Sequence, residues 1–318
     1  MVSVSHLTRR FGEFTAVDDL SFNVAAGEVV GFLGPNGAGK STTMKMITGF
    51  LAPTMGDVSV CGFDIEKQPR EAKARIGYLP EGAPMYGDMS TERFLNFIGQ
   101  VRGFRGDELA SRVEAAINRV QLQEVRGQTI ETLSKGFKRR VGIAQAILHD
   151  PEVLVLDEPT DGLDPNQKHE VRSLIQEISA DKAIIISTHI LEEVDAVCSR
   201  ALIIARGRLL ADGTPGELES RAHGHNAIEL IVQADTAEKV SAALASLGGV
   251  AETRSSDRGD GSTALTLFPS DGANLLPQVN GVIADQQLQV EQLYLQRGRL
   301  EQLFRDLTLA NSGDRSRS

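Results

Sequence analysis

The chain is poor in several features that would assign it to particular classes of protein. Its 318 residues include two cysteines, three tyrosines and no tryptophan. No apolar run reaches the roughly 18 residues that a membrane-spanning helix needs. The first residues, Val-Ser-Val-Ser-His after the initial Met, lack the charged flank and apolar core of a secretory signal. We therefore expect no membrane span and no signal peptide, and a chain that stays in the cytoplasm.

The cysteines and the charge exclude further classes. Cys61 and Cys198 lie far apart and form no C-x-x-C motif, as expected for reduced thiols in a reducing compartment. The formal net charge of −10 argues against a protein that wraps nucleic acid, because phosphate binding needs a basic surface. With 41% hydrophobic and 24% charged residues, the composition is that of a soluble globular protein, long enough for two domains.

A glycine-rich stretch near the N-terminus carries the most specific chemical signal. The phosphate-loop pattern G-x-x-x-x-G-K-[ST] is matched in every fixed position by Gly34, Pro35, Asn36, Gly37, Ala38, Gly39, Lys40 and Ser41, with Thr42 following. An apolar run precedes the loop and a segment of helical spacing follows it, which is the order such a loop requires. Lys40 then supplies a charge for the β- and γ-phosphates of a nucleotide, and the Ser41 hydroxyl is a ligand for Mg²⁺.

Two later apolar runs end in polar residues. The first, 153–156, ends in Asp157 and Glu158, and the second, 184–186, is followed by Ser187, Thr188 and His189. Strands this apolar are buried on both faces of a mostly parallel sheet, whose carboxyl ends bind ligands. Asp157 can hold Mg²⁺, Glu158 can deprotonate a water, and His189 can bond a γ-phosphate. The alternatives are a helix N-cap cluster for the acids and a structural role for the histidine.

Helical periodicity dominates the region between these motifs. Apolar stripes in 92–101 and 109–120 predict a helical insert at about 88–150. Near its end, Ser134 is a suitable N-cap for a further helix whose positive end would face an anion. Between two predicted N-terminal antiparallel strands lie Phe11 and Val17; the Phe11 ring either stacks on a purine or packs under a hairpin.

The composition changes after Leu218. We expect a linker at 219–226, a small α+β domain at 227–310 and a disordered tail at 311–318. The order of strands and helices in the second domain is β-α-β-β-α-β followed by a helix, which predicts a ferredoxin-like fold. It contains no catalytic constellation, so we expect a role in regulation or dimer contact.

The order of these motifs through residue 218 resembles an ABC transporter ATP-binding subunit. The resemblance implies an α/β phosphate-loop NTPase with a mixed sheet core, an antiparallel β subdomain and a helical subdomain. It also implies ATP and Mg²⁺ as cofactors, with Phe11 against adenine, Val17 beside it among the nucleotide-binding residues, Glu158 as catalytic base and His189 as γ-phosphate sensor. Members of this family work as ATP-sandwiched dimers.

The dimer implies a second set of site residues. Ser134 and Gly136 would serve the nucleotide of the opposite subunit, and Asp164 lies in the loop that crosses the interface. Two departures from the family occur: Glu81 replaces the usual Gln, and Leu-Ser-Lys-Gly-Phe at 133–137 replaces Leu-Ser-Gly-Gly-Gln. Glu81 keeps an oxygen for Mg²⁺ but adds a charge. Both departures resemble ABC-2 type exporters, including gliding-motility, copper-maturation and drug-export systems, whose permease is a separate chain.

The resemblance predicts an ATPase at the cytoplasmic face of the membrane that powers a transmembrane permease, paired with itself or a sibling ATPase and without nucleic acid. One alternative is a soluble ABC ATPase, but those usually carry two cassettes or a coiled-coil insert. Another is a regulatory nucleotide-binding module, which would not need Glu158 and His189. We expect the permease to contact Met85, Tyr86 and Met89, apolar residues without helical periodicity.

Overall fold

The computed structural model describes residues 1–82, 85–222, 224–296, 298 and 300–310. The tail expected at 311–318 lies outside these residues. The chain divides into two compact units, Met1–Thr214 and Pro215–Ser318, which we describe separately. The second unit begins with helix α8 (Pro215–Ser220), so the first residues of the expected linker are helical.

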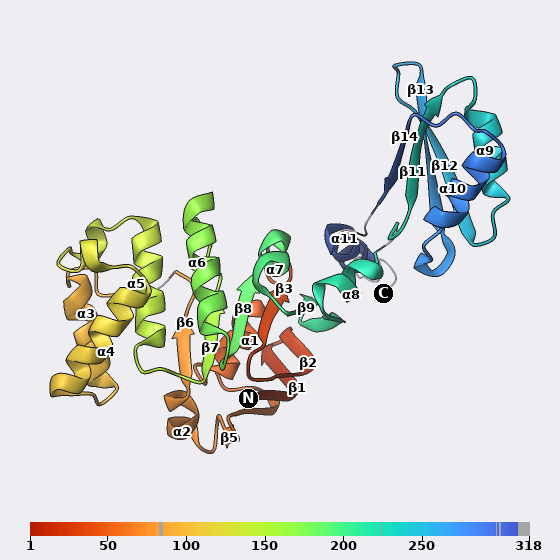
Figure 1. The fold of residues 1–318 in the computed structure, drawn as a ribbon. Coiled ribbons are helices and arrows are strands. Elements are labelled where there is room, and N and C mark those ends of the chain that lie inside the picture. The colour runs from red at the N-terminus through yellow and green to blue at the C-terminus, as the bar shows by residue number, and fades with distance from the viewer. Residues whose placement is uncertain (83–84, 223, 297, 299, 311–318) are drawn as a thin grey trace. The chain divides into compact units, whose positions relative to one another are not determined.

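A six-stranded sheet forms the centre of the first unit, in the order β10-β9-β3-β8-β7-β6 (Figure 1). Its members are β3 (Val29–Leu33), β6 (Ile76–Leu79), β7 (Val153–Asp157), β8 (Ala183–Thr188), β9 (Arg200–Ala205) and β10 (Arg208–Gly213). β3 and β6 to β9 run parallel, and β10 returns antiparallel to β9. β3, β7 and β8 are buried along their whole length. Their carboxyl ends therefore lie at one edge of the sheet, as the sequence predicts.

An antiparallel sheet packs against this core, in the order β2-β1-β4-β5. Its strands are β1 (Val2–Phe11), β2 (Phe14–Val24), β4 (Met55–Val60) and β5 (Phe63–Asp64). Phe22 of β2 meets Phe32 of β3 edge to face, with ring centroids 5.0 Å apart. Met44 and Ile47 of helix α1 (Lys40–Ile47) belong to the same buried cluster. The mixed sheet core and antiparallel subdomain are thus confirmed.

Helices complete the first unit. Those within the predicted insert are α3 (Thr91–Val101), α4 (Gly106–Arg119) and α5 (Lys135–Ile147), with short 3-10 turns at Gln123–Val125 and Ile130–Thr132. They gather at one side of the unit, beyond β6, in orange-yellow to yellow-green (Figure 1). The others are α2 (Pro69–Ala74), α6 (Pro165–Ile178) and α7 (Leu191–Val197). The helical subdomain is confirmed.

The second unit confirms the ferredoxin-like prediction. After α8 come β11 (Ile228–Gln233), α9 (Ala237–Ala245), β12 (Val250–Asp257), β13 (Ser262–Pro269), a 3-10 turn (Ser270–Gly272), α10 (Leu276–Asp285), β14 (Gln292–Leu295) and α11 (Leu300–Ala310). The strands form an antiparallel sheet, β12-β13-β11-β14.

The last strand differs in position from the sequence prediction, which set it at 288–293. Leu288 instead closes helix α10, because its N–H donates to the Ile283 carbonyl, and its side chain is buried in the core of the unit.

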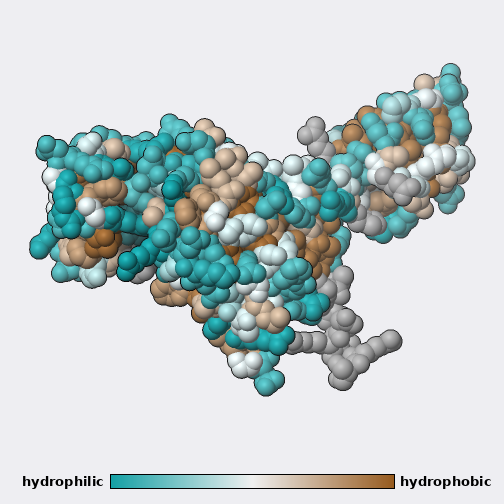
Figure 2. Space-filling model, turned by 90° about the horizontal axis from the view of Figure 1, so that it is seen from below, coloured by the Kyte–Doolittle hydropathy of each residue, from teal (hydrophilic) through white to brown (hydrophobic). Residues whose placement is uncertain are grey.

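Within the described residues, no helix is both long and apolar enough to cross a membrane. On the face drawn in Figure 2, teal hydrophilic residues cover most of the surface, and brown apolar residues form separate patches among them.

Candidate nucleotide-phosphate site

The phosphate loop joins the end of β3 to the start of α1. Pro35, Asn36 and Gly37 are exposed, whereas Ala38 is buried. Gly37 and Gly39 have φ angles of +79° and +103°, a region that favours glycine. A Cβ on Gly39 would also lie 2.6 Å from the Ala16 carbonyl oxygen. Backbone conformation and close packing both explain why glycine occupies this position.

Lys40 is the first residue of α1, and its side chain is only 5% exposed. Its ammonium donates to the Gly34 carbonyl at 2.7 Å and to the Pro35 carbonyl at 3.3 Å. Glu158 Oε1 lies 4.0 Å from Nζ. Burial lowers the pKa of Lys40, and the carboxylates of Glu158, Asp157 and Glu81 oppose that shift. The loop therefore holds a positive charge directly beside the acids of the site.

Asp157, at the end of β7, has no exposed surface. Its Oδ1 accepts hydrogen bonds from Ser41 Oγ at 3.2 Å and from the Ser187 hydroxyl. Its Oδ2 is buried and has no hydrogen-bond partner among the described residues. An unpaired carboxylate oxygen beside a serine hydroxyl offers the hard oxygen ligands that Mg²⁺ prefers. The residues present fit a magnesium ion.

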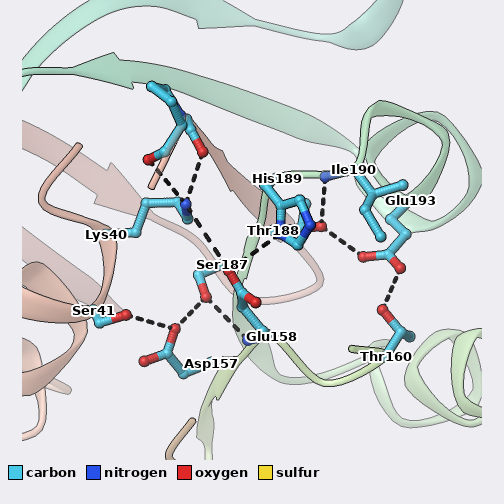
Figure 3. A network of polar contacts seen from close by, with 12 residues as sticks. Lys40, Ser41, Asp157, Glu158, Thr160, Ser187, Thr188, His189, Ile190 and Glu193 are labelled. Atoms are coloured by element: carbon cyan, nitrogen blue, oxygen red, sulfur yellow. Dashed lines mark hydrogen bonds and ion pairs between the residues drawn. The ribbon is translucent and has the colours of Figure 1, made fainter. Parts of the chain in front are cut away.

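Glu158 and His189 come from neighbouring strands and face each other (Figure 3). His189 Nδ1 lies 3.3 Å from Glu158 Oε1, and the side chains are 43% and 15% exposed. Glu158 has a φ of +49°, unusual for a residue with a side chain. The Glu158 N–H donates a hydrogen bond to the Ser187 hydroxyl at 3.0 Å, which helps to hold this turn. The carboxylate is thus directed at the site by a strained, supported backbone.

The two residues expected near adenine differ in environment. Phe11 ends β1 with its side chain 47% exposed, and the Arg9 guanidinium lies 4.6 Å from its ring centroid. Val17 is 1% exposed and belongs to the core, so it packs behind the phosphate loop, close to Gly39. Phe11 therefore presents its ring to solvent, whereas the Val17 side chain is buried.

The residues expected to act across a dimer lie at helix starts. Ser134 caps α5 by accepting from the Phe137 N–H at 3.3 Å, and Asp164 caps α6 by accepting from the Gln167 N–H at 3.0 Å. Both are exposed, whereas Gly136 is buried. A Cβ on Gly136 would meet the Gln167 side chain at 2.6 Å.

Glu81 and the remaining loop residues complete the set. Glu81 follows β6 and is exposed, and its charge acts on Lys40. Ser41 and Thr42 lie in the first turn of α1 and are half-buried. The structure thus brings together Lys40, Ser41, Asp157, Glu158 and His189, while Phe11, Ser134, Gly136 and Asp164 are not part of their contact network.

Sequence reasoning missed a buried cation. Arg139 of α5 is 8% exposed, and its Nη1 has no hydrogen-bond partner among the described residues. Burial lowers the pKa of its guanidinium, and the carboxylates of Asp161, Glu158, Asp157 and Glu81 oppose that shift. The only sequence signal was a charged residue in a helix with a wide apolar face. Arg139 balances part of the negative charge of the site.

Comparison with known proteins agrees with this geometry. The profile of the family described as ABC transporter matches residues 17–161. The Nod factor export ATP-binding protein I of Paraburkholderia xenovorans is 36% identical over 230 residues, covering 72% of this chain and 76% of that protein. The probable multidrug ABC transporter ATP-binding protein YbhF of Escherichia coli is 34% identical over 226 residues, covering 70% of this chain. The match spans 38% of the length of YbhF.

A solved structure shows the same fold. CbiO1 from Clostridium perfringens, described as part of the ABC transporter complex cbiONQ, superposes with a TM-score of 0.63 at 30% identity, covering 69% of this chain and 90% of that one. Fold and site define a phosphate-loop ATPase cassette. The chain belongs to the family of ABC transporter ATP-binding proteins.

Proposed function

We propose that this chain binds ATP with Mg²⁺, hydrolyses the ATP and thereby powers a separate transmembrane permease of an ABC-2 type exporter. The observation that carries the proposal is the convergence of Lys40, Ser41, Asp157, Glu158 and His189 at the carboxyl ends of β3, β7 and β8. This set contains the anion-binding, metal-binding and proton-accepting groups that phosphoryl transfer to water requires.

Each residue has a role that follows from its environment. Lys40 and the loop N–H groups bind the phosphates, and Phe11 contacts the adenine. Ser41, Asp157 and Glu81 would hold Mg²⁺. When bound, Mg²⁺ supplies positive charge that stabilises the phosphate oxygens. Glu158 accepts a proton from the attacking water, and His189 holds that water or the γ-phosphate in place.

A dimer of cassettes is the second part of the proposal. Ser134 and Asp164 are exposed on the first unit, as contact with another subunit requires. The start of α5 presents N–H groups to a nucleotide bound by that subunit. The partner is a second copy or a sibling ATPase. ATP between the two subunits would then close the dimer.

The permease is expected to dock beside α3. Tyr86 is 53% exposed, and its ring stands edge to face on Phe97 at 5.5 Å between centroids. Met85 and Met89 flank it and are half-buried. Along the same helix, Ile98 and Val101 line a groove of about 380 Å³ together with Phe50 and Tyr78. Phe50 and Val101 are 77% and 69% exposed. An apolar groove beside the site suits a short permease helix.

The choice of an exporter rests on the relatives named for export and multidrug transport and on Glu81 and the Lys-Gly-Phe sequence at 135–137. Such a subunit would lie peripherally at the cytoplasmic face of the membrane.

Coupling to a permease provides the test of this function. The purified chain would be combined in lipid vesicles with candidate permeases, chosen as multi-span membrane proteins encoded by neighbouring genes, and phosphate release from ATP would be measured with and without Mg²⁺. We expect Mg²⁺-dependent hydrolysis that changes several-fold when the membrane protein is present. Hydrolysis that is indifferent to every candidate permease would favour a soluble ATPase instead.

A further inference from the structure

Behind the Glu158–His189 pair lies a buried carboxylate, that of Glu193 in α7. The residue is 5% exposed. Both of its oxygens accept hydrogen bonds from threonine hydroxyls, Oε1 from Thr160 and Oε2 from Thr188 at 2.6 Å (Figure 3). Lys168 Nζ lies 3.8 Å from Oε1 and partly balances the charge. Glu193 therefore links two loops that come from different strands.

Those two loops carry the catalytic candidates. Thr160 stands two residues after Glu158, and Thr188 directly precedes His189. The Thr188 hydroxyl also accepts from the Ile190 N–H at 3.0 Å, so it fixes the backbone on both sides of His189. Thr160 and Thr188 are 3% and 2% exposed. Glu193 is thus bonded to the segment on which each member of the pair is mounted.

The backbone of Glu158 is supported by Ser187, whereas the His189 side chain is less constrained. His189 is 43% exposed, so packing alone does not set its position. The 3.3 Å contact between His189 Nδ1 and Glu158 Oε1 depends on how the two loops are held. The buried Glu193 carboxylate accepts a hydrogen bond from a hydroxyl group in each loop. It holds the two loops together rigidly, because a charge taken out of water is stable only while such bonds are made.

We propose that Glu193 is a positioning residue for ATP hydrolysis: its carboxylate, bonded to Thr160 and Thr188, sets the placement of Glu158 relative to His189. The proposal rests on the function proposed above. Glu193 touches neither of those two side chains directly in the network, so its effect passes through the threonines. Nucleotide binding, which depends on Lys40 and the phosphate loop, is separate.

The first test replaces the carboxylate with an amide. Glu193→Gln keeps the shape but leaves one threonine without its charged acceptor. We expect kcat to fall about tenfold, because displacements of an ångström or less have large effects on positioned groups. The KM for ATP and its affinity by calorimetry should stay within about twofold, since the phosphate loop is intact. Glu192→Gln, which alters an exposed acid next to it in α7, is the matched control and should leave kcat unchanged.

A second pair of variants separates positioning from folding. Thr160→Val removes the hydroxyl at similar volume and should lower kcat as Glu193→Gln does, whereas Thr160→Ser keeps the hydroxyl and should restore it. Thermal unfolding of each variant gives an independent measure of stability. If Val and Ser at this position lower kcat equally, the hydroxyl bond to Glu193 does not act on catalysis.

The decisive readout is coupling to His189. If Glu193 acts by holding the pair, adding Glu193→Gln to His189→Ala should cause almost no further loss of kcat. Full additivity of the two changes, or a normal kcat for Glu193→Gln, would overturn the proposal. A wild-type protein that fails to hydrolyse ATP would instead contradict the proposed function, so the two failures are distinguishable.

Discussion

The two sheets of this chain use polar residues differently. In the six-stranded sheet, β7 and β8 run parallel, and each ends in buried polar residues at the same edge, among them Asp157, Ser187 and Thr188. In the sheet of the second unit, neighbouring strands run antiparallel, so successive strand ends lie at opposite edges. An ion pair of this unit, Arg254 with Glu252, lies exposed on one strand. Neighbouring parallel strands place the polar residues at their carboxyl ends at the same edge of the sheet, whereas neighbouring antiparallel strands place them at opposite edges.

Burial sharpens the contrast. The site in the first unit contains Lys40, Asp157 and Glu193, each 5% exposed or less, with their charges facing one another or hydroxyls. In the described part of the second unit, Ser262 is the one polar side chain that is buried. This contrast supports the proposal that catalysis belongs to the first unit, and that the second unit acts in regulation or dimer contact.

The largest effect that tests this contrast is on nucleotide binding. Lys40→Ala removes the buried charge that faces the phosphates, and a charge-assisted contact contributes roughly 1.5–3 kcal/mol. We expect ATP affinity to fall by about ten- to more than a hundredfold in calorimetry. Lys45→Ala, in the same helix, is the control and should bind ATP normally. An unchanged affinity for Lys40→Ala would remove the phosphate-loop assignment.

The next prediction concerns the permease. Replacing Tyr86 and Met89 together with Asp places charges on the proposed docking surface, so co-purification with the permease and transport should be strongly reduced. Basal ATP hydrolysis by the isolated subunit should remain within a few-fold of wild type, because neither residue contacts the acids of the site. Normal transport by this double variant would place the docking surface elsewhere.

A smaller effect is expected when the second unit is removed. The hydrophobic cores of the two units are formed by different residues, and Leu218, which is buried, belongs to the chain segment of the second unit. Truncation after Thr214 therefore removes the whole second unit, whereas truncation after Leu218 would leave part of helix α8. The shortened chain should bind ATP within about twofold of the full chain, while dimerisation or the response to the permease changes. Loss of ATP binding in a folded truncation would show that the second unit helps to build the site.

The smallest effect concerns a buried histidine away from the site. Burial, followed by the charge of Arg102, lowers the pKa of His149 from 6.5 to about 4. Its Nε2 donates to the Ile76 carbonyl at 3.0 Å, as a neutral ring does. Between pH 6.5 and 4 the unfolded chain binds more protons, so the free energy of unfolding falls as the pH decreases through this window.

His149→Gln keeps a donor for Ile76 and does not titrate. Between pH 6.5 and 4, the free energy of unfolding of this variant should fall less than that of the wild type. The difference should be on the order of 2 kcal/mol. Denaturant unfolding at several pH values gives the comparison. Parallel pH profiles for the two proteins would mean that the pKa of His149 is the same in the folded and the unfolded chain.

Local patterns made much of this architecture predictable. The phosphate loop is one continuous stretch. The strand that ends in Asp157 and the strand that precedes His189 are recognisable by their apolar runs, so the sequence predicts both strand ends. The resemblance to ABC subunits supplied the roles. The ferredoxin-like order could also be predicted, because alternation and helical spacing are properties of single segments.

Long-range contacts account for what could not be predicted. Val17 is buried behind the phosphate loop, and no pattern near it indicates that position. Thr160, Arg139 and Glu193 acquire their roles from partners on other elements. The last strand lies at Gln292–Leu295 and not at 288–293, and Leu288 instead follows the end of α10 with its N–H bonded to the Ile283 carbonyl. Such contacts are set by the tertiary fold.

Glu158, which follows the end of β7, is proposed to act in ATP hydrolysis and not in ATP binding. The most direct test is to measure ATP affinity and ATP turnover in Glu158→Gln, which keeps the shape of the side chain and removes the base. We predict a turnover at least about 10²-fold below wild type with ATP still bound, and an ATP-stabilised dimer. Near-normal turnover in this variant would contradict the account, because another group would then activate the water.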